Sequence, residues 1–193
     1  MKWVECILII AGISFDMLAS MEVQGAMLQE IKKKKLLGVT SLVVLLQCIF
    51  FIGGYVGSYL LSKVTPLKDA NQVGYFISAV IFLLLGLRLL VKAIRREFVD
   101  ECRKEITVKQ YVRIIAVSSI YTIFAGIGCQ MLGANLLYMV IIIIAFSFLD
   151  VFAGIYGGYH FGFEAKTKWY AVGTIILWFT GVEIIVRNLM TIM

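Results

Sequence analysis

The chain has little of what most soluble enzymes use. Its only proline, Pro66, falls in a predicted loop, so no long apolar segment is interrupted by proline. Its four cysteines form no Cys-x-x-Cys pair, which argues against a zinc or redox site. Its one histidine, His160, ends an apolar segment and is expected to pack at an interface. No hydrolase, kinase or dinucleotide motif is present, so we expect neither an enzyme nor a bound cofactor.

What the chain does have is apolar sequence. Hydrophobic residues make up 61% of its 193 residues, against about 45–50% in soluble globular domains. A helix needs about 20 apolar residues to cross a bilayer. Six segments reach that length, at about 4–27, 36–61, 73–94, 111–131, 134–160 and 169–190. The sequence therefore predicts an all-α membrane protein with six transmembrane helices and the lipid bilayer as its main partner.

The net charge of +6 gathers in alternate loops. Lysines and arginines crowd the loops after the first, third and fifth segments, beginning with the run 32–35. Few lie on the other side: Lys2, Lys63, Lys68 and Arg187. The positive-inside rule then places the three basic loops in the cytoplasm and both termini outside. The charge orients a multi-pass protein in the bacterial cytoplasmic membrane, and we expect no nucleic-acid partner.

Short sequences recur in the same order in the two halves of the chain. The matched runs are GGYVGSYLL from Gly53 with GGYHFGFEA from Gly157, GLRLLVK from Gly86 with GVEIIVR from Gly181, and SFDML from Ser14 with SIYTI from Ser119. A second copy of three helices enters the membrane from the opposite side, as in many transporters. We therefore predict two inverted three-helix repeats, at 1–94 and 111–193, joined by a cytoplasmic connector at 95–110. The short turn 133–135 predicts a tight helical hairpin.

Two aspartates, Asp16 and Asp150, lie deep in apolar segments with no basic residue within one turn. A charge there costs about 2.5–3.5 kcal/mol, whereas a polar bond between membrane helices contributes only about 0.6 kcal/mol. Packing alone therefore does not account for them. Paired carboxylates suit a hard divalent cation, and further oxygen donors are predicted at Gln47, Ser20 and Ser14.

Other polar positions are predicted to line the substrate pathway. The repeat matches Asp16 with Tyr121 and Arg88 with Glu183, and it places Gln47 within a residue of the position matching Asp150. The predicted pathway residues are Tyr121, Ser147, Glu183 and Arg88. The predicted helix-packing glycines are Gly53, Gly54, Gly157 and Gly158, because small residues let membrane helices approach closely.

The run GISFDMLASMEVQGA, residues 12–26, resembles the first helix of the MntP-type manganese efflux pumps, which carries a Gly-x-Ser-x-Asp motif. Gln47 and the glycines that follow it resemble the second helix of that family. The resemblance implies six helices and export of Mn²⁺ as the transported substrate. One position departs from it: the family's fourth helix carries a second aspartate, where this chain has Tyr121. Either the second carboxylate comes from Asp150 in the neighbouring helix, or the chain is a divergent member of the family with another substrate.

Two other functions remain open on the sequence. An exporter of small organic solutes would need an aromatic-lined cavity, for which Tyr121, Phe124 and Tyr159 are candidates. A membrane subunit that works with a separate energising partner would need a docking surface, for which the segment 95–110 is the candidate. A homo-oligomer is open as well.

Overall fold

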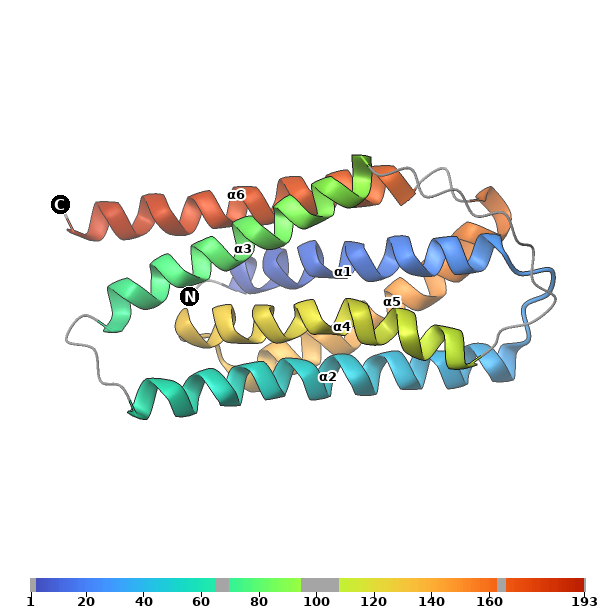
Figure 1. The fold of residues 1–193 in the computed structure, drawn as a ribbon, viewed down its shortest axis with the longest axis horizontal. Coiled ribbons are helices and arrows are strands. Elements are labelled where there is room, and N and C mark those ends of the chain that lie inside the picture. Colours follow the sequence, from blue (N-terminus) through green and yellow to red (C-terminus); the bar gives the residue numbers. More distant parts are fainter. Residues whose placement is uncertain (1–2, 65–69, 95–107, 163–165, 193) are drawn as a thin grey trace.

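Six long helices, and no strand, form the part of the chain described by the computed structural model, residues 3–64, 70–94, 108–162 and 166–192 (Figure 1). The helices are α1 (Trp3–Ala26), α2 (Lys33–Val64), α3 (Ala70–Ile94), α4 (Val108–Met131), α5 (Leu136–Phe161) and α6 (Lys166–Ile192). Their bounds agree with the predicted segments to within three residues. Hydropathy locates membrane helices well because the backbone must satisfy its hydrogen bonds within each segment.

Five of these helices, all but α4, are long and apolar enough to span a membrane. Within the described part of α4 the apolar stretch is the shorter Ile120–Met131. The chain is thus a multi-pass membrane protein. Most of the predicted connector, 95–107, lies outside the described residues, and α4 already begins at Val108.

The two ends of the bundle differ in charge. Both chain termini lie at one end, on the left of Figure 1. At the other end α1, α3 and α5 finish and α2, α4 and α6 begin. This second end, called the basic end below, carries the lysine run 32–35 and Lys92, Lys166 and Lys168.

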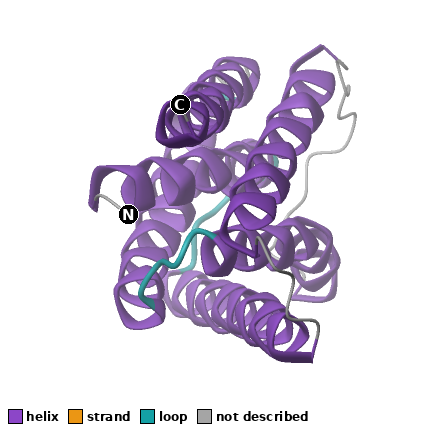
Figure 2. Cartoon of the chain, turned by 90° about the vertical axis from the view of Figure 1, so that its left-hand side faces the viewer, coloured by secondary structure: helices purple, strands orange, loops and turns teal. Residues whose placement is uncertain are grey.

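The two halves of the chain interlock. α1 packs against α5 and α6, α2 packs against α4 and α5, and α3 packs against α6 and α4. Among the described helices of one half, the most extensive contact is a small one between α1 and α3. Figure 2, turned by 90° from Figure 1, shows the helices packed side by side in one bundle. Each half therefore depends on the other for nearly all of its helix packing.

The turn between α4 and α5 is short, but the predicted tight hairpin is wrong. Gly133 takes a φ of +70°, and the Asn135 side chain accepts a hydrogen bond from the Leu137 amide at 3.0 Å, capping α5. The described parts of α4 and α5 nevertheless make no extensive contact, because α4 is held by α2 and α5 by α1.

Glycines bring two helix pairs into backbone contact. A Cβ atom at Gly25 or Gly158 would overlap the main chain of the facing helix, α5 or α1. A Cβ atom at Gly54 or Gly126 would do the same between α2 and α4. These contacts define the α1/α5 pair and the α2/α4 pair, the names used below.

Only one glycine of each predicted Gly-Gly dipeptide serves this packing. A Cβ atom at Gly53 or Gly157 would meet nothing within 4 Å, whereas Gly54 and Gly158 lie against a neighbouring backbone. Successive helical residues are turned by about 100°, so adjacent positions face different neighbours. The packing role predicted for Gly53 and Gly157 is corrected accordingly.

Candidate cation site

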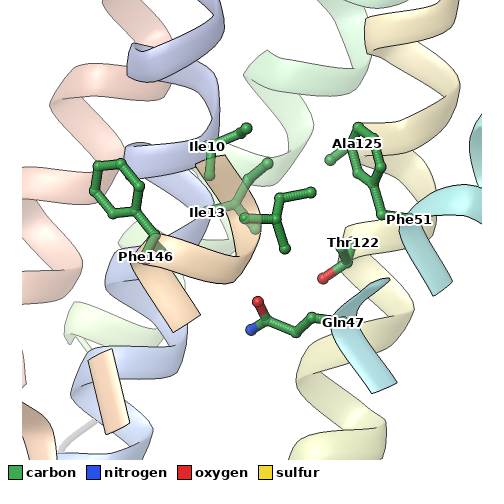
Figure 3. A pocket seen from close by; sticks show the side chains of 9 residues that line it. Ile10, Ile13, Gln47, Phe51, Thr122, Ala125 and Phe146 are labelled. Carbon is green, nitrogen blue, oxygen red and sulfur yellow. The ribbon is translucent and has the colours of Figure 1, made fainter. Parts of the chain in front are cut away.

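A small cavity of about 20 Å³ lies between the α1/α5 pair and the α2/α4 pair (Figure 3). That volume is room for about one water molecule. Its lining residues are Ile10, Ile13, Ser14, Gln47, Phe51, Thr122, Ala125, Ile143 and Phe146. Figure 3 shows the polar ends of Gln47 and Thr122 below the side chain of Ile13, with Ile10 above and the Phe146 ring farther to the left. All four helices of the two pairs contribute to the cavity near their middles.

Two hydrogen bonds extend the polar part of the cavity into α5. The Ser14 hydroxyl donates to the Asp150 carboxylate, and the Ser147 hydroxyl donates to Gln47 Oε1 at 2.6 Å. The side chains of all four residues are buried, and Asp150 is only 3% exposed. The polar lining of the cavity is therefore Ser14, Gln47 and Thr122, and the Asp150 carboxylate and the Ser147 hydroxyl lie one hydrogen bond behind it.

Asp150 carries no compensating charge. No Lys or Arg pairs with it in the described ranges. In a membrane interior an isolated carboxylate is costly, and such residues are usually part of an ion or proton pathway. Asp150 is thus a buried acid with no Lys or Arg paired to it among the described residues.

Asp16 is held differently. The Arg88 guanidinium donates to its Oδ2 at 3.1 Å, and the Lys92 ammonium donates to its Oδ1 at 2.6 Å. Arg88 also lies over the ring of Tyr121, and Lys92 is 5.5 Å from the centroid of the Tyr170 ring. We call these five residues the Asp16 cluster. The two cations of the cluster come from α3. The spacing of residues along α1 could not predict that they would meet Asp16.

The structure does not place the two predicted aspartates in one cavity. Asp16 and Ser14 lie about 160° apart around α1, and Asp150 is on the Ser14 side. Ser20 does not reach toward the Asp16 carboxylate either. Its hydroxyl donates to the main-chain carbonyl of Asp16 at 2.8 Å. Of the predicted ligands, the structure therefore groups Ser14, Gln47 and Asp150.

The predicted pathway residues also divide. Ser147 joins the cavity network, whereas Arg88 and Tyr121 belong to the Asp16 cluster. Trp178 of α6 contacts Leu83 of α3. From this contact, Glu183 lies toward the end of the bundle that holds the chain termini, whereas Arg88 lies toward the basic end. The repeat-related positions Arg88 and Glu183 are therefore not brought together.

Sequence reasoning misses the roles of two polar residues. Thr122 lines the cavity, and Lys92 neutralises Asp16. The position of Thr122 beside Tyr121 is the one local signal that could have pointed to it. No cluster of three or more His, Cys, Asp or Glu side chains is found in the residues that were placed. A cation site here would rely largely on hydroxyl and amide oxygens.

Apolar helices around a buried polar centre define a multi-pass membrane protein of the transporter class. Residues 30–185 match the model of the MntP family, described as "Putative manganese efflux pump", and the chain belongs to this family of transporters. No curated protein and no solved structure matches the chain. The matched range contains Gln47, Tyr121 and Asp150 but begins after α1, so the motif around Asp16 lies outside it.

Proposed function

We propose that the protein exports a divalent cation, with Mn²⁺ as the main substrate, across the bacterial cytoplasmic membrane. In this proposal the basic end lies in the cytoplasm and both termini lie outside, as the positive-inside rule requires. The observation that carries it is Asp150, which is buried at mid-helix, pairs with no Lys or Arg in the described ranges, and is hydrogen-bonded to Ser14 in the lining of the cavity. Hard cations such as Mn²⁺ prefer carboxylate, carbonyl and hydroxyl oxygens over sulfur and imidazole.

We also propose that the chain consists of two inverted three-helix repeats. The pattern of helix contacts supports this, because its extensive contacts are preserved when α1, α2 and α3 are exchanged with α4, α5 and α6. This exchange turns the α1/α5 pair into the α2/α4 pair. It leaves the contact between α3 and α6 unchanged, because each of these helices takes the place of the other.

Details of the contact between α3 and α6 support the same arrangement. The sequence match of Gly86 with Gly181 also matches Leu83 with Trp178. A Cβ atom at Gly86 would meet Trp178, and one at Gly181 would meet Leu83. Trp178 Nε1 donates to the Leu83 carbonyl at 3.2 Å, so the matched residues also bond to each other. Each contact thus has its counterpart under a two-fold exchange.

The interlocked packing suggests which parts move. If one half rocked against the other, nearly every helix contact would have to change. The cavity instead lies between the α1/α5 pair and the α2/α4 pair, each of which is fixed internally by glycine contacts. We propose that access alternates by a shift of one helix pair against the other.

The organic-solute alternative has less support. The cavity is too small for such a solute, and two of the aromatic residues predicted to line it, Phe124 and Tyr159, are 45% and 42% exposed. The docking segment of the partner-subunit alternative lies mostly outside the described residues.

The test is Mn²⁺ flux into liposomes that contain purified protein and a trapped Mn²⁺-quenched dye. Wild type is expected to move Mn²⁺, and Asp150→Asn is expected to lose at least nine-tenths of the transport rate. A tenfold loss corresponds to about 1.4 kcal/mol, roughly the contribution expected of one ionic ligand. Thr180→Ala is the control, because Thr180 is buried but its hydroxyl bonds only within α6, to the Ile176 carbonyl. A wild type that moves no divalent cation, or a fully active Asp150→Asn, would overturn the proposal.

A further inference from the structure

The Asp16 cluster contains more positive than negative charge among its bonded groups. Arg88 and Lys92 each bond a different oxygen of the Asp16 carboxylate. One carboxylate between two cations leaves an excess of one positive charge. A purely structural pair would need only one of these cations, so the second calls for an explanation.

Both cations are more exposed than the carboxylate they bond. The Asp16 side chain is 5% exposed, whereas the side chains of Arg88 and Lys92 are 19% and 31% exposed. Lys92 lies in the last turn of α3, at the basic end. Long basic side chains near a helix end can extend toward the membrane interface. The Tyr121 and Tyr170 rings offer each cation a second contact through cation–π attraction.

The cluster does not line the cavity but lies next to residues that do. Ile13 lines the cavity and lies one helical turn before Asp16, about 60° away around α1. On the facing helix, Thr122 lines the cavity and directly follows Tyr121. A divalent cation in the cavity is therefore near a group of side chains with net positive charge, which repels it.

We propose that Arg88 and Lys92 are tethered counter-cations that neutralise Asp16 and whose excess positive charge acts on the divalent cation in the neighbouring cavity. This charge lowers the affinity of the cavity for the ion, so that the ion is released. Both act as positioning residues and not as ligands. The inference rests on the proposed divalent-cation transport and assigns to the same site the residues that set its affinity.

The test measures Mn²⁺ binding by the electron paramagnetic resonance signal of free Mn²⁺, together with turnover in liposomes. Lys92→Gln and Arg88→Gln are each expected to tighten Mn²⁺ binding roughly three- to tenfold. This is the change in affinity expected when one partly exposed positive charge near the ion is removed. Turnover is expected to fall, because the bound ion leaves more slowly. Arg88→Lys keeps the charge and should retain an affinity near that of wild type.

Lys63→Gln is the matched control. Lys63 also lies over a tyrosine ring, that of Tyr59, 4.7 Å from the centroid, but it is in the last turn of α2 at the terminal end. Its loss should leave the Mn²⁺ dissociation constant unchanged. If Lys63→Gln tightens binding as much as Lys92→Gln does, overall charge explains the effect and the inference fails.

The remaining outcomes separate this inference from the proposed function. If wild type binds Mn²⁺ but the Arg88 and Lys92 variants bind it equally or more weakly, the cluster is structural and only the inference is overturned. If wild type binds no divalent cation at all, the proposed function fails and the inference fails with it. Gel filtration identifies misfolded variants, and Lys92→Gln still retains the Arg88–Asp16 pair.

Discussion

Single side chains decide which buried aspartate can meet an ion. Asp16 and Asp150 look alike in sequence, because each interrupts a long apolar run. In the folded chain Asp16 is bonded to two cations, whereas Asp150 accepts a hydroxyl hydrogen bond from Ser14. The difference lies in residues more than 70 positions away from each aspartate, which spacing within one helix cannot show.

Gln47 gives a residue-scale prediction. Gln47→Glu should tighten Mn²⁺ binding about tenfold, because it adds a second carboxylate to the cavity beside Asp150, and one decade corresponds to about 1.4 kcal/mol. Gln47→Met keeps a similar volume without the oxygen and should weaken binding. Titration of free Mn²⁺ measures both. Equal affinities in the two variants would remove Gln47 from the site.

Tyr121 gives a second prediction for a single residue. Tyr121→Leu removes the ring beneath Arg88 and should lower the free energy of unfolding by about 0.5–2 kcal/mol, the range for a cation–π contact. Tyr121→Phe keeps the ring and should unfold close to wild type. Thermal unfolding in detergent, followed by tryptophan fluorescence, compares them. A Phe variant as unstable as the Leu variant would assign the effect to the hydroxyl.

At the scale of the element, helix pairing depends on which face a glycine occupies. Gly157 and Gly158 are neighbours in sequence, yet only Gly158 contacts the main chain of α1. The same holds for Gly53 and Gly54 against α4. Composition predicts that small residues pack, but the face is set by the rotation of the whole helix against its partner.

The neighbouring glycines form a matched pair for testing. Gly158→Ala should lower the free energy of unfolding by about 1–3 kcal/mol, because the added methyl group overlaps the Glu22 carbonyl. Gly157→Ala meets open space and should be neutral or slightly stabilising, since alanine favours helix by up to about 1 kcal/mol. Thermal unfolding measures both. A Gly157→Ala variant that is equally unstable would contradict this packing.

At the scale of the whole molecule, the halves are interlocked and the cavity separates two helix pairs that each contain one helix from either half. Alternation between pairs makes a different prediction from rocking between halves. Contacts within a pair should persist through the transport cycle, and contacts across the cavity should change.

Thiol crosslinking distinguishes these motions in a chain whose four native cysteines are replaced. Ser58→Cys with Gln130→Cys joins α2 to α4, whose side chains bond at 2.8 Å, and transport should survive crosslinking. Phe51→Cys with Ile143→Cys spans the cavity between the pairs, and crosslinking should stop Mn²⁺ flux until the link is cleaved. Rocking of one half against the other predicts that both links stop transport.

The sequence by itself determined the class, the six helices and the family, because hydropathy and motifs are local properties. It also identified Asp150, Gln47, Ser14 and Ser147, since an oxygen-bearing side chain in an apolar run is visible without a fold. Only the tertiary structure decided that Asp16 is neutralised by α3, that Asp150 has no paired Lys or Arg among the described residues, and that Gly158 packs while Gly157 does not. Those outcomes depend on how helices are rotated and paired across the two halves, which no periodicity within a single helix specifies.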